Sequence, residues 1–416
     1  MGTTCPGWRR PYSLRKTLAP CHSERSEESQ QLQFQTTAEI LRWFENRGVG
    51  VSPAVAAASR SRARAGRGTT FVHDGLYFPD AIALRVKSPA GRRTPGHGHL
   101  TTGHMIATVT LNPAIDKSLT VPRFEVGKTN RGEVGRTDAS GKGINVAMAL
   151  KQFGADVCAL GFMAGSDGQF ILEALASSGI PADFVSVPGE TRVNLKIRDP
   201  IYRTETELNE PGFQVLPAHL EALKRKIREY APRCEVMTFS GSLPPGAPPK
   251  TYAELMRIAK ALGSKCMLDT DGPALRLGLQ TKPRLVKPNR AEVEELLERP
   301  LPTRLDLAEA ASKLLEMGAG MALISLGAEG AVAACEGELL VARPPAVAVR
   351  SSTGAGDAMV AAFAYGEIRH LSFRGSFRLA MAASAASVAT EGTKFADLAA
   401  IKHLLPEVHV EEISKA

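Results

Sequence analysis

The chain has 416 residues, of which 44% are hydrophobic and 23% are charged, so it has the composition of a globular protein with room for two or three domains. It contains no apolar run long enough to span a membrane and no apolar stretch of the signal-peptide kind, which argues against a membrane protein and predicts a cytoplasmic location. The six cysteines are scattered without a C-x-x-C pair, so neither a disulfide framework nor a zinc site is expected.

The net charge of +8 lies entirely in the first quarter of the chain. Residues 1–104 contain 15 Lys and Arg against 7 Asp and Glu, whereas residues 105–416 contain 36 of each kind. The first segment is rich in clusters such as ASRSRARAGRG and has little regular hydrophobic periodicity. We expect it to be a disordered extension, or a product of a mis-assigned start codon with the true start at Met105. The alternative is an Arg-rich arm that binds nucleic acid.

From Met105 onward, buried-strand patterns alternate with amphipathic-helix patterns. Strands are predicted at 105–111, 156–162, 235–239, 265–269 and 321–326, and helices at 143–154, 166–179, 251–263, 291–298 and 354–368. Such an alternation predicts an α/β fold in which a mostly parallel sheet is sandwiched between helices.

Two polar segments interrupt this alternation, at about 118–138 and 191–212. Each reads as a pair of strands around a turn, with too few apolar residues for a central strand. We expect them to form a small, separate β-sheet that acts as a lid. A lid fits the position of ligand sites in open α/β folds, which lie at the carboxyl ends of the strands.

The segment SSTGAGDAMVAAF, residues 351–363, carries the strongest chemical signal. Gly354, Ala355 and Gly356 open a helix, so their free amide groups and the helix dipole favour an anion. Asp357 follows in the first turn, where it could take a proton from a hydroxyl while the amides hold a phosphoryl group. The alternative is a tight turn followed by a helix cap.

A second glycine-rich segment, ASGKGINVAMAL, also begins a helix. Gly141 allows the backbone to approach a ligand, and Lys142 and Asn145 offer donors to hydroxyl or phosphate groups. The spacing is neither that of a P-loop nor that of a dinucleotide-binding G-x-G-x-x-G turn. Taken alone, a simple glycine turn at a helix start explains it equally well.

Three further motifs place polar residues after predicted strands. Asp116 follows the first strand, where it either accepts sugar hydroxyls or caps a loop. Asn289 and Glu292 have the spacing of a capping box, and the same geometry can hold the water shell of Mg²⁺. The segment ISLGAEGA offers bare backbone for a nucleotide at Ser325, Gly327 and Gly330.

Together these motifs resemble the phosphofructokinase B family of the ribokinase superfamily, over residues 105–416. The ordered series NPAID, GKGINVA, TRVN, SGSLPPG, KPNRAE, SLGAEGA and GAGD carries the resemblance. It is similar above all to the hexose-phosphate branch, which includes 1-phosphofructokinases and tagatose-6-phosphate kinases. The resemblance implies a ribokinase-like kinase domain that phosphorylates fructose 1-phosphate with ATP and Mg²⁺, with tagatose 6-phosphate or fructose 6-phosphate as alternative acceptors.

The resemblance also implies a role for each candidate residue. Asp357 would be the catalytic base and Gly354, Ala355 and Gly356 the anion hole. The sugar would be held by Asp116, Gly141, Lys142 and Asn145, and its phosphate by Arg192 with Lys128 and Asn194. Asn289 and Glu292 would organise Mg²⁺ through water, and the nucleotide site would be lined by Lys287, Asn289, Ser325, Gly327 and Gly330.

The resemblance further implies a homodimer formed through the lid, with no membrane or nucleic-acid partner for residues 105–416. A rival interpretation from a different class is a non-catalytic regulatory protein whose Arg-rich arm binds nucleic acid. The intact Asp357 and the residues Gly354 to Gly356 argue against it, because a scaffold without activity does not need them.

Overall fold

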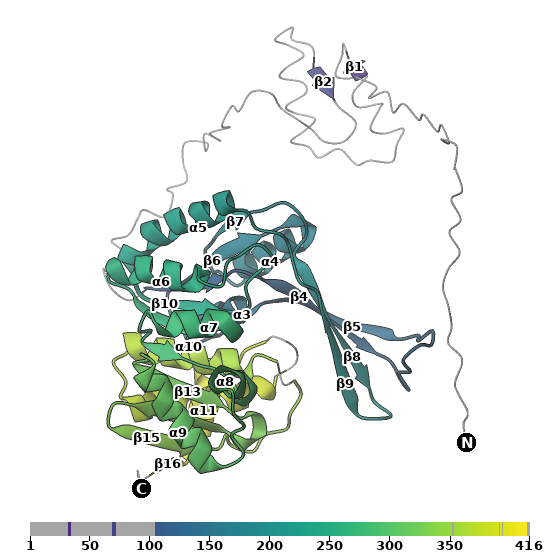
Figure 1. Ribbon diagram of the computed structural model, residues 1–416. Coiled ribbons are helices and arrows are strands. Elements are labelled where there is room, and N and C mark those ends of the chain that lie inside the picture. The colour runs from purple at the N-terminus through teal and green to yellow at the C-terminus, as the bar shows by residue number, and fades with distance from the viewer. Residues whose placement is uncertain are drawn as a thin grey trace, which may run out of the picture. The chain divides into compact units, whose positions relative to one another are not determined.

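The computed structural model describes residues 105–351, 353–390, 392 and 394–413, together with two short strands near the N-terminus (Figure 1). These strands, β1 (Leu32–Phe34) and β2 (Thr69–Phe71), pair antiparallel. The chain divides into two compact units, Met1–Gly96 and His97–Ala416. Apart from β1 and β2, residues 1–104 lie outside the described residues, and so do the predictions made for them, including the Arg-rich arm. No helix in the described part is long and apolar enough to cross a membrane.

The larger unit is built on a ten-stranded sheet with the order β16-β15-β14-β13-β12-β11-β10-β3-β6-β7. From β13 to β7 all neighbouring strands pair in parallel, and the last three, β14 to β16, pair antiparallel at one edge. The prediction of a mostly parallel sheet is therefore confirmed. The strands are β3 (Met105–Thr110), β6 (Val157–Met163), β7 (Ala182–Ser186), β10 (Cys234–Ser240), β11 (Lys265–Asp269), β12 (Leu285–Val286), β13 (Met321–Ser325), β14 (Ala331–Cys335), β15 (Glu338–Ala342) and β16 (Val410–Glu412).

Helices cover both faces of this sheet and enclose two hydrophobic cores (Figure 1). Side chains alternate between the faces, so that Ile106 of β3 packs in the first core and Ala107 in the second. The first core is closed by α3 (Lys142–Gln152), α4 (Gly165–Ser177), α10 (Ala355–Ile368), α11 (Phe373–Val388) and α12 (Leu398–Leu404). The second is closed by α5 (Pro217–Tyr230), α6 (Thr251–Ala261), α7 (Gly272–Leu279), α8 (Arg290–Leu297) and α9 (Arg304–Glu316).

The two polar segments form a separate four-stranded sheet with the order β5-β4-β8-β9, which extends away from the main body in Figure 1. We call this sheet the lid. Its strands are β4 (Ala114–Thr120), β5 (Glu133–Ser140), β8 (Arg192–Asp199) and β9 (Thr204–Asn209). The predicted small sheet is therefore confirmed, and the parallel pairing of β4 with β8 brings the two distant segments together.

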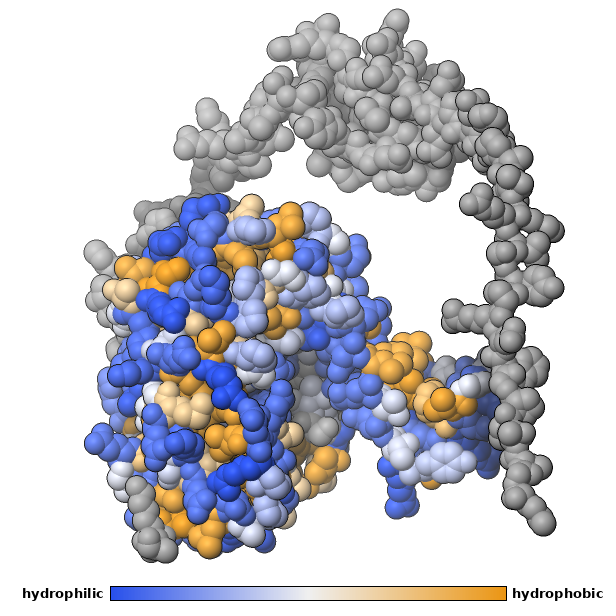
Figure 2. Space-filling model, in the orientation of Figure 1, coloured by the Kyte–Doolittle hydropathy of each residue, from blue (hydrophilic) through white to orange (hydrophobic). Residues whose placement is uncertain are grey.

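The lid has a polar side and an apolar side, because side chains alternate along each strand. Registers place Asp116, Asn194 and Lys196 on one side, whereas Leu195 lies opposite Leu208, and Leu119 opposite Val134, on the other. Val134 is 76% exposed and Leu208 55% exposed. Figure 2 shows apolar colour on the surface of the lid. Such an uncovered apolar face is typical of a contact surface.

Candidate active site

The loop before α10 has the geometry of an anion site. Gly354 is the residue before the helix and has a left-handed backbone, with φ of 84°. A Cβ atom there would be strained by this backbone conformation and would lie in tight contact, 3.0 Å, with the ring of Phe395, so both the conformation and the packing favour glycine. The helix starts at Ala355, and the amide groups of its first turn have no partners within the helix. The structure thus places Gly354, Ala355 and Gly356, the segment predicted to bind an anion, at the start of a helix.

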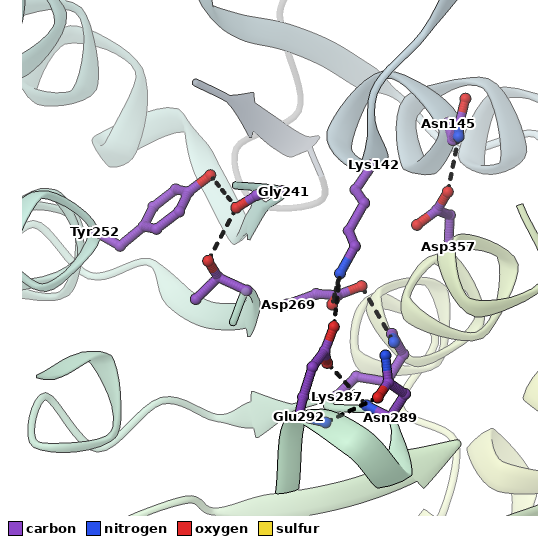
Figure 3. Close-up of polar contacts among 10 residues, drawn as sticks. Lys142, Asn145, Gly241, Tyr252, Asp269, Lys287, Asn289, Glu292 and Asp357 are labelled. Carbon is purple, nitrogen blue, oxygen red and sulfur yellow. Dashed lines mark hydrogen bonds and ion pairs between the residues drawn. The ribbon is translucent and has the colours of Figure 1, made fainter. Parts of the chain in front are cut away.

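Asp357 is buried in the first turn of α10 and contacts α3. Its Oδ2 accepts a hydrogen bond of 2.8 Å from Asn145 Nδ2 (Figure 3). Burial, reinforced by the negative charge of Asp269, raises the pKa of Asp357 to about 6, although the Asn145 hydrogen bond and nearby lysines oppose the shift. A carboxylate with such a pKa is well suited to accept a proton near neutral pH.

Asp269, at the end of β11, organises the centre of the site. Lys142 Nζ lies 2.9 Å from its Oδ1, and Lys287 Nζ lies 3.3 Å from its Oδ2 (Figure 3). Burial opposes the charge on Asp269, but the two ammonium groups outweigh it and hold the pKa of this carboxyl below its usual value. Burial likewise disfavours the charge on Lys142, yet Asp269 and Glu292 raise its pKa above the usual range. Lys142, predicted as a sugar ligand, is therefore tied to the buried Asp269 and the partly buried Glu292.

Lys287 brings positive charge to the anion loop. Its side chain is buried, and its Nζ would lie only 3.2 Å from a Cβ atom placed on Gly356. The ammonium group thus sits beside the helix start that carries the free amides, and Asp269 fixes it there. An incoming phosphoryl group would meet amide dipoles and a full positive charge in one place.

Asn289 and Glu292 form the capping box that their spacing predicts. Asn289 Oδ1 accepts from Glu292 N, and Glu292 Oε2 accepts from Asn289 N, both at 2.9 Å. Glu292 Oε1 lies 3.5 Å from Lys142 Nζ. Among the described residues no group of three His, Cys, Asp or Glu side chains could hold a metal directly. Glu292 Oε1 takes no part in the cap, and besides its 3.5 Å contact with Lys142 it has a lone pair that can accept a hydrogen bond from the water shell of a Mg²⁺ ion.

The expected sugar side is formed by the lid and the start of α3. Asn194 Nδ2 donates to Asp116 Oδ1 at 3.0 Å, which fixes the buried carboxylate on the polar side of the lid. Gly141 has φ of 120°, and a Cβ atom on it would lie 3.0 Å from the Cα of Pro113. Gly141 is buried, so glycine is needed here both for this backbone conformation and for the close packing against Pro113.

Arg192 lines a cavity of about 540 Å³ together with Asn112, Ser242 and Asp271. Its Nε is buried without a hydrogen-bond partner, and its Nη1 reaches Glu210 O only at 3.4 Å. A guanidinium group with unused donors facing a cavity favours an anionic ligand. Lys128 does not line this cavity; it lies in the turn between β4 and β5 with its side chain 68% exposed and pairs with Glu125.

The predicted nucleotide residues follow β13. Ser325 ends this strand and forms a β-bridge with Asn289, so the two predicted segments lie side by side. Gly327 and Gly330 both have positive φ, of 59° and 104°. A Cβ atom on Gly330 would lie 2.0 Å from Ala342 O, so this glycine is also needed for the close packing of β15.

The site thus combines a buried carboxyl group, a helix start and clustered lysines at the carboxyl edge of a parallel sheet. The sequence model of the pfkB family carbohydrate kinases matches residues 107–399. The chain belongs to this family. Family members are carbohydrate kinases, which use ATP to phosphorylate an alcohol group.

Curated relatives and solved structures agree with this assignment. The chain is 40% identical over 280 residues to a 1-phosphofructokinase of Rhodobacter capsulatus, covering 67% of this chain and 89% of that protein. It is 36% identical to the 1-phosphofructokinase of Escherichia coli strain K12, covering 74% of this chain and 98% of that protein. The structure of the tetrameric inhibited form of phosphofructokinase-2 from E. coli superposes with a TM-score of 0.68 at 27% identity, covering 73% and 99% of the two chains.

Proposed function

We propose that the chain transfers the γ-phosphoryl group of ATP to the C6 hydroxyl of fructose 1-phosphate, which yields fructose 1,6-bisphosphate and ADP. The observation that best supports this proposal is that the buried Asp357, whose pKa is raised to about 6, lies beside the free amides at the start of α10. The relatives named 1-phosphofructokinase support fructose 1-phosphate as the acceptor.

In the proposed step the acceptor oxygen attacks the γ-phosphorus while the bond from that phosphorus to the β–γ bridging oxygen breaks. The hydroxyl proton passes to Asp357, whose Oδ2 is oriented by Asn145. The amides of Gly354, Ala355 and Gly356 and the ammonium of Lys287 stabilise the charge on the transferred group. Catalysis then depends on positioning and electrostatics, with no covalent enzyme intermediate.

For the sugar phosphate, Asp116, Gly141, Lys142 and Asn145 would bind the hydroxyl groups. The phosphate already present would meet the unused donors of Arg192. Asn194 and Lys128, which the resemblance also assigns to this phosphate, do not line the Arg192 cavity. In this proposal the buried carboxylate of Asp116 binds sugar hydroxyls, and the guanidinium of Arg192 binds the phosphate in the cavity that it lines.

For ATP, we assign the nucleotide to the strip formed by Lys287, Asn289, Ser325, Gly327 and Gly330. Mg²⁺, when bound, would neutralise charge on the phosphates. Glu292 would orient its water shell through the carboxylate oxygen that the capping box leaves over.

Steady-state ATP consumption with fructose 1-phosphate, fructose 6-phosphate and tagatose 6-phosphate, compared side by side, tests the proposal. We expect the highest kcat/KM with fructose 1-phosphate, both in the full chain and in a chain that begins at Met105. A strong preference for either 6-phosphate would replace the proposed acceptor. No turnover with any of the three sugars would contradict the hexose-phosphate assignment.

We also propose a homodimer formed through the apolar side of the lid, where Val134 and Leu208 are exposed. The tetrameric form of E. coli phosphofructokinase-2 gives a precedent for assembly in a related fold. The cytoplasmic location stays a prediction, which cell fractionation tests.

A further inference from the structure

Lys196 lies where the lid meets the loop that opens α10. Its register partners are Ser118 of β4 and Glu207 of β9, and it follows Asn194 by two residues, so it shares the polar side of the lid with Asp116. Only 12% of its side chain is exposed. None of the motifs in the sequence draws attention to it.

The ammonium group of Lys196 joins three separate segments. It donates to Thr353 Oγ1 at 2.5 Å and lies 3.4 Å from Asp116 Oδ2 and 3.7 Å from Glu207 Oε1. Thr353 directly precedes Gly354, the residue with the left-handed backbone at the start of the anion loop. An ammonium group has three donors and no acceptor, so one side chain can serve all three partners.

A second contact between the lid and the main body lies beside the first. Arg136 and Asp138 of β5 form a bidentate pair, with Nε and Nη2 at 3.1 and 2.7 Å from the carboxylate oxygens. A Cβ atom on Gly392 would lie 2.5 Å from Asp138 Oδ2 and 2.7 Å from Arg136 Nε. The lid therefore contacts the main body at both of these places, and the Lys196 contact leads directly to the loop before α10.

We propose that Lys196 is a positioning residue that couples the sugar site to the phosphoryl-binding loop. This inference rests on the proposed function, because it takes Asp116 as a sugar ligand and Gly354 to Gly356 as the anion hole. A bound sugar would fix the Asp116 carboxylate, which pairs with the ammonium group of Lys196, and this ammonium group donates a hydrogen bond to Thr353. The anion loop is then ordered before ATP binds, and less conformational entropy is lost when it does.

The coupling has a thermodynamic signature. A sugar phosphate should tighten the binding of ATP, and by linkage ATP should tighten the binding of the sugar phosphate by the same factor. Couplings of this kind are commonly fivefold to more than a hundredfold, so we expect roughly a tenfold effect. Removing either end of the Lys196–Thr353 contact should abolish this mutual effect.

The experiment measures the Kd of a non-hydrolysable ATP analogue by calorimetry, with and without saturating fructose 1-phosphate. In the unmodified chain the ratio of the two values should be roughly tenfold. In Lys196→Met and in Thr353→Val it should fall below about twofold, and the double variant should be no lower than either single one. A ratio that stays near tenfold in both single variants would overturn the inference.

Arg198→Met is the matched control, because Arg198 lies two residues further along the same side of β8 and pairs with Glu205 inside the lid. It should keep the ratio of the unmodified chain; an equal loss of coupling in this variant would show that any disturbance of the lid suffices and would overturn the assignment to Lys196.

Hydrogen exchange of the ligand-free protein separates this inference from the proposed function. Lys196→Met should speed exchange of the amides at 353–357 several-fold whichever sugar is the acceptor, and unchanged exchange would refute the positioning role. If another hexose phosphate proves to be the substrate, that sugar replaces fructose 1-phosphate in the calorimetry, and the same ratios decide the inference.

Discussion

Replacing Asp357 with Asn should destroy activity and stabilise the protein at the same time. The amide cannot accept the hydroxyl proton, and general-base catalysis contributes about 10²- to 10⁴-fold, so kcat should fall by about that factor. The carbonyl oxygen of the new side chain can still accept the hydrogen bond from Asn145 Nδ2, now 2.8 Å from Asp357. The fold around α10 should therefore persist.

The gain in stability follows from the raised pKa of Asp357. The pKa of Asp357 is about 6 in the folded state against an ordinary value of 3.8, so the folded state favours the protonated carboxyl. Stability is accordingly lost as the pH rises from about 3.8 through 6, and above that range the cost reaches about 3 kcal/mol, at 1.36 kcal/mol for each pKa unit. Asn carries no charge, so Asp357→Asn should be more stable by up to that amount at pH 7 and by little at pH 4.

Urea unfolding at pH 4, 5, 6 and 7, alongside kcat measurements, checks both effects. Asp167→Asn is the matched control, because Asp167 holds the same third position in the first turn of α4. The control should keep normal turnover and show no stabilisation that grows with pH. Normal turnover in Asp357→Asn would refute its role as the base, and an unchanged or lower free energy of unfolding at pH 7 would refute the burial argument.

Three further predictions follow from the site and the lid. Glu292→Gln keeps an oxygen that accepts from the Asn289 amide, so the free energy of unfolding should change by less than about 0.5 kcal/mol. The Mg²⁺ concentration for half-maximal activity should rise several-fold, and an unchanged Mg²⁺ concentration would contradict the assignment of Glu292 to the Mg²⁺ site. Arg192→Ala should raise KM for the sugar phosphate at least tenfold and leave KM for ATP within about twofold, because a charge-assisted phosphate contact is worth about 1.5–3 kcal/mol; a rise confined to ATP would refute the phosphate clamp. Leu208→Glu, with Val134→Glu as an independent second variant, should shift sedimentation from dimer to monomer, whereas a monomeric unmodified chain would contradict the lid interface.

The architecture and the location of the site could be predicted from the sequence because their signals are local. The anion loop is one continuous segment, and the capping box of Asn289 and Glu292 is set by a spacing of three residues. The lid was also predictable, since each of its two segments is an unusually polar strand pair. Each of these features depends on residues close together in the chain.

The sequence did not reveal the contacts that join distant segments. Asp269 pairs with Lys142 across 127 residues, and no motif relates the two. The position of Asp269 at the carboxyl end of a buried strand was a usable signal, because the carboxyl ends of parallel strands meet at one edge. Lys196 carried no such signal, since a lysine in a polar strand usually faces water and only the folded lid places it against Thr353.

The contact between Asn145 and Asp357 has a consequence for synthesis of the chain. Asn145 and Asp357 are 212 positions apart in the sequence. The central strands β3 and β10 are also distant, since Met105 of β3 pairs with Cys234 of β10, 129 positions later. Such long-range contacts form late, after loop closure over most of the domain. A growing chain on the ribosome therefore lacks its base and its anion loop until nearly the whole domain has emerged. We therefore expect that incomplete chains do not hydrolyse ATP and that kinase activity appears only when the domain has folded completely.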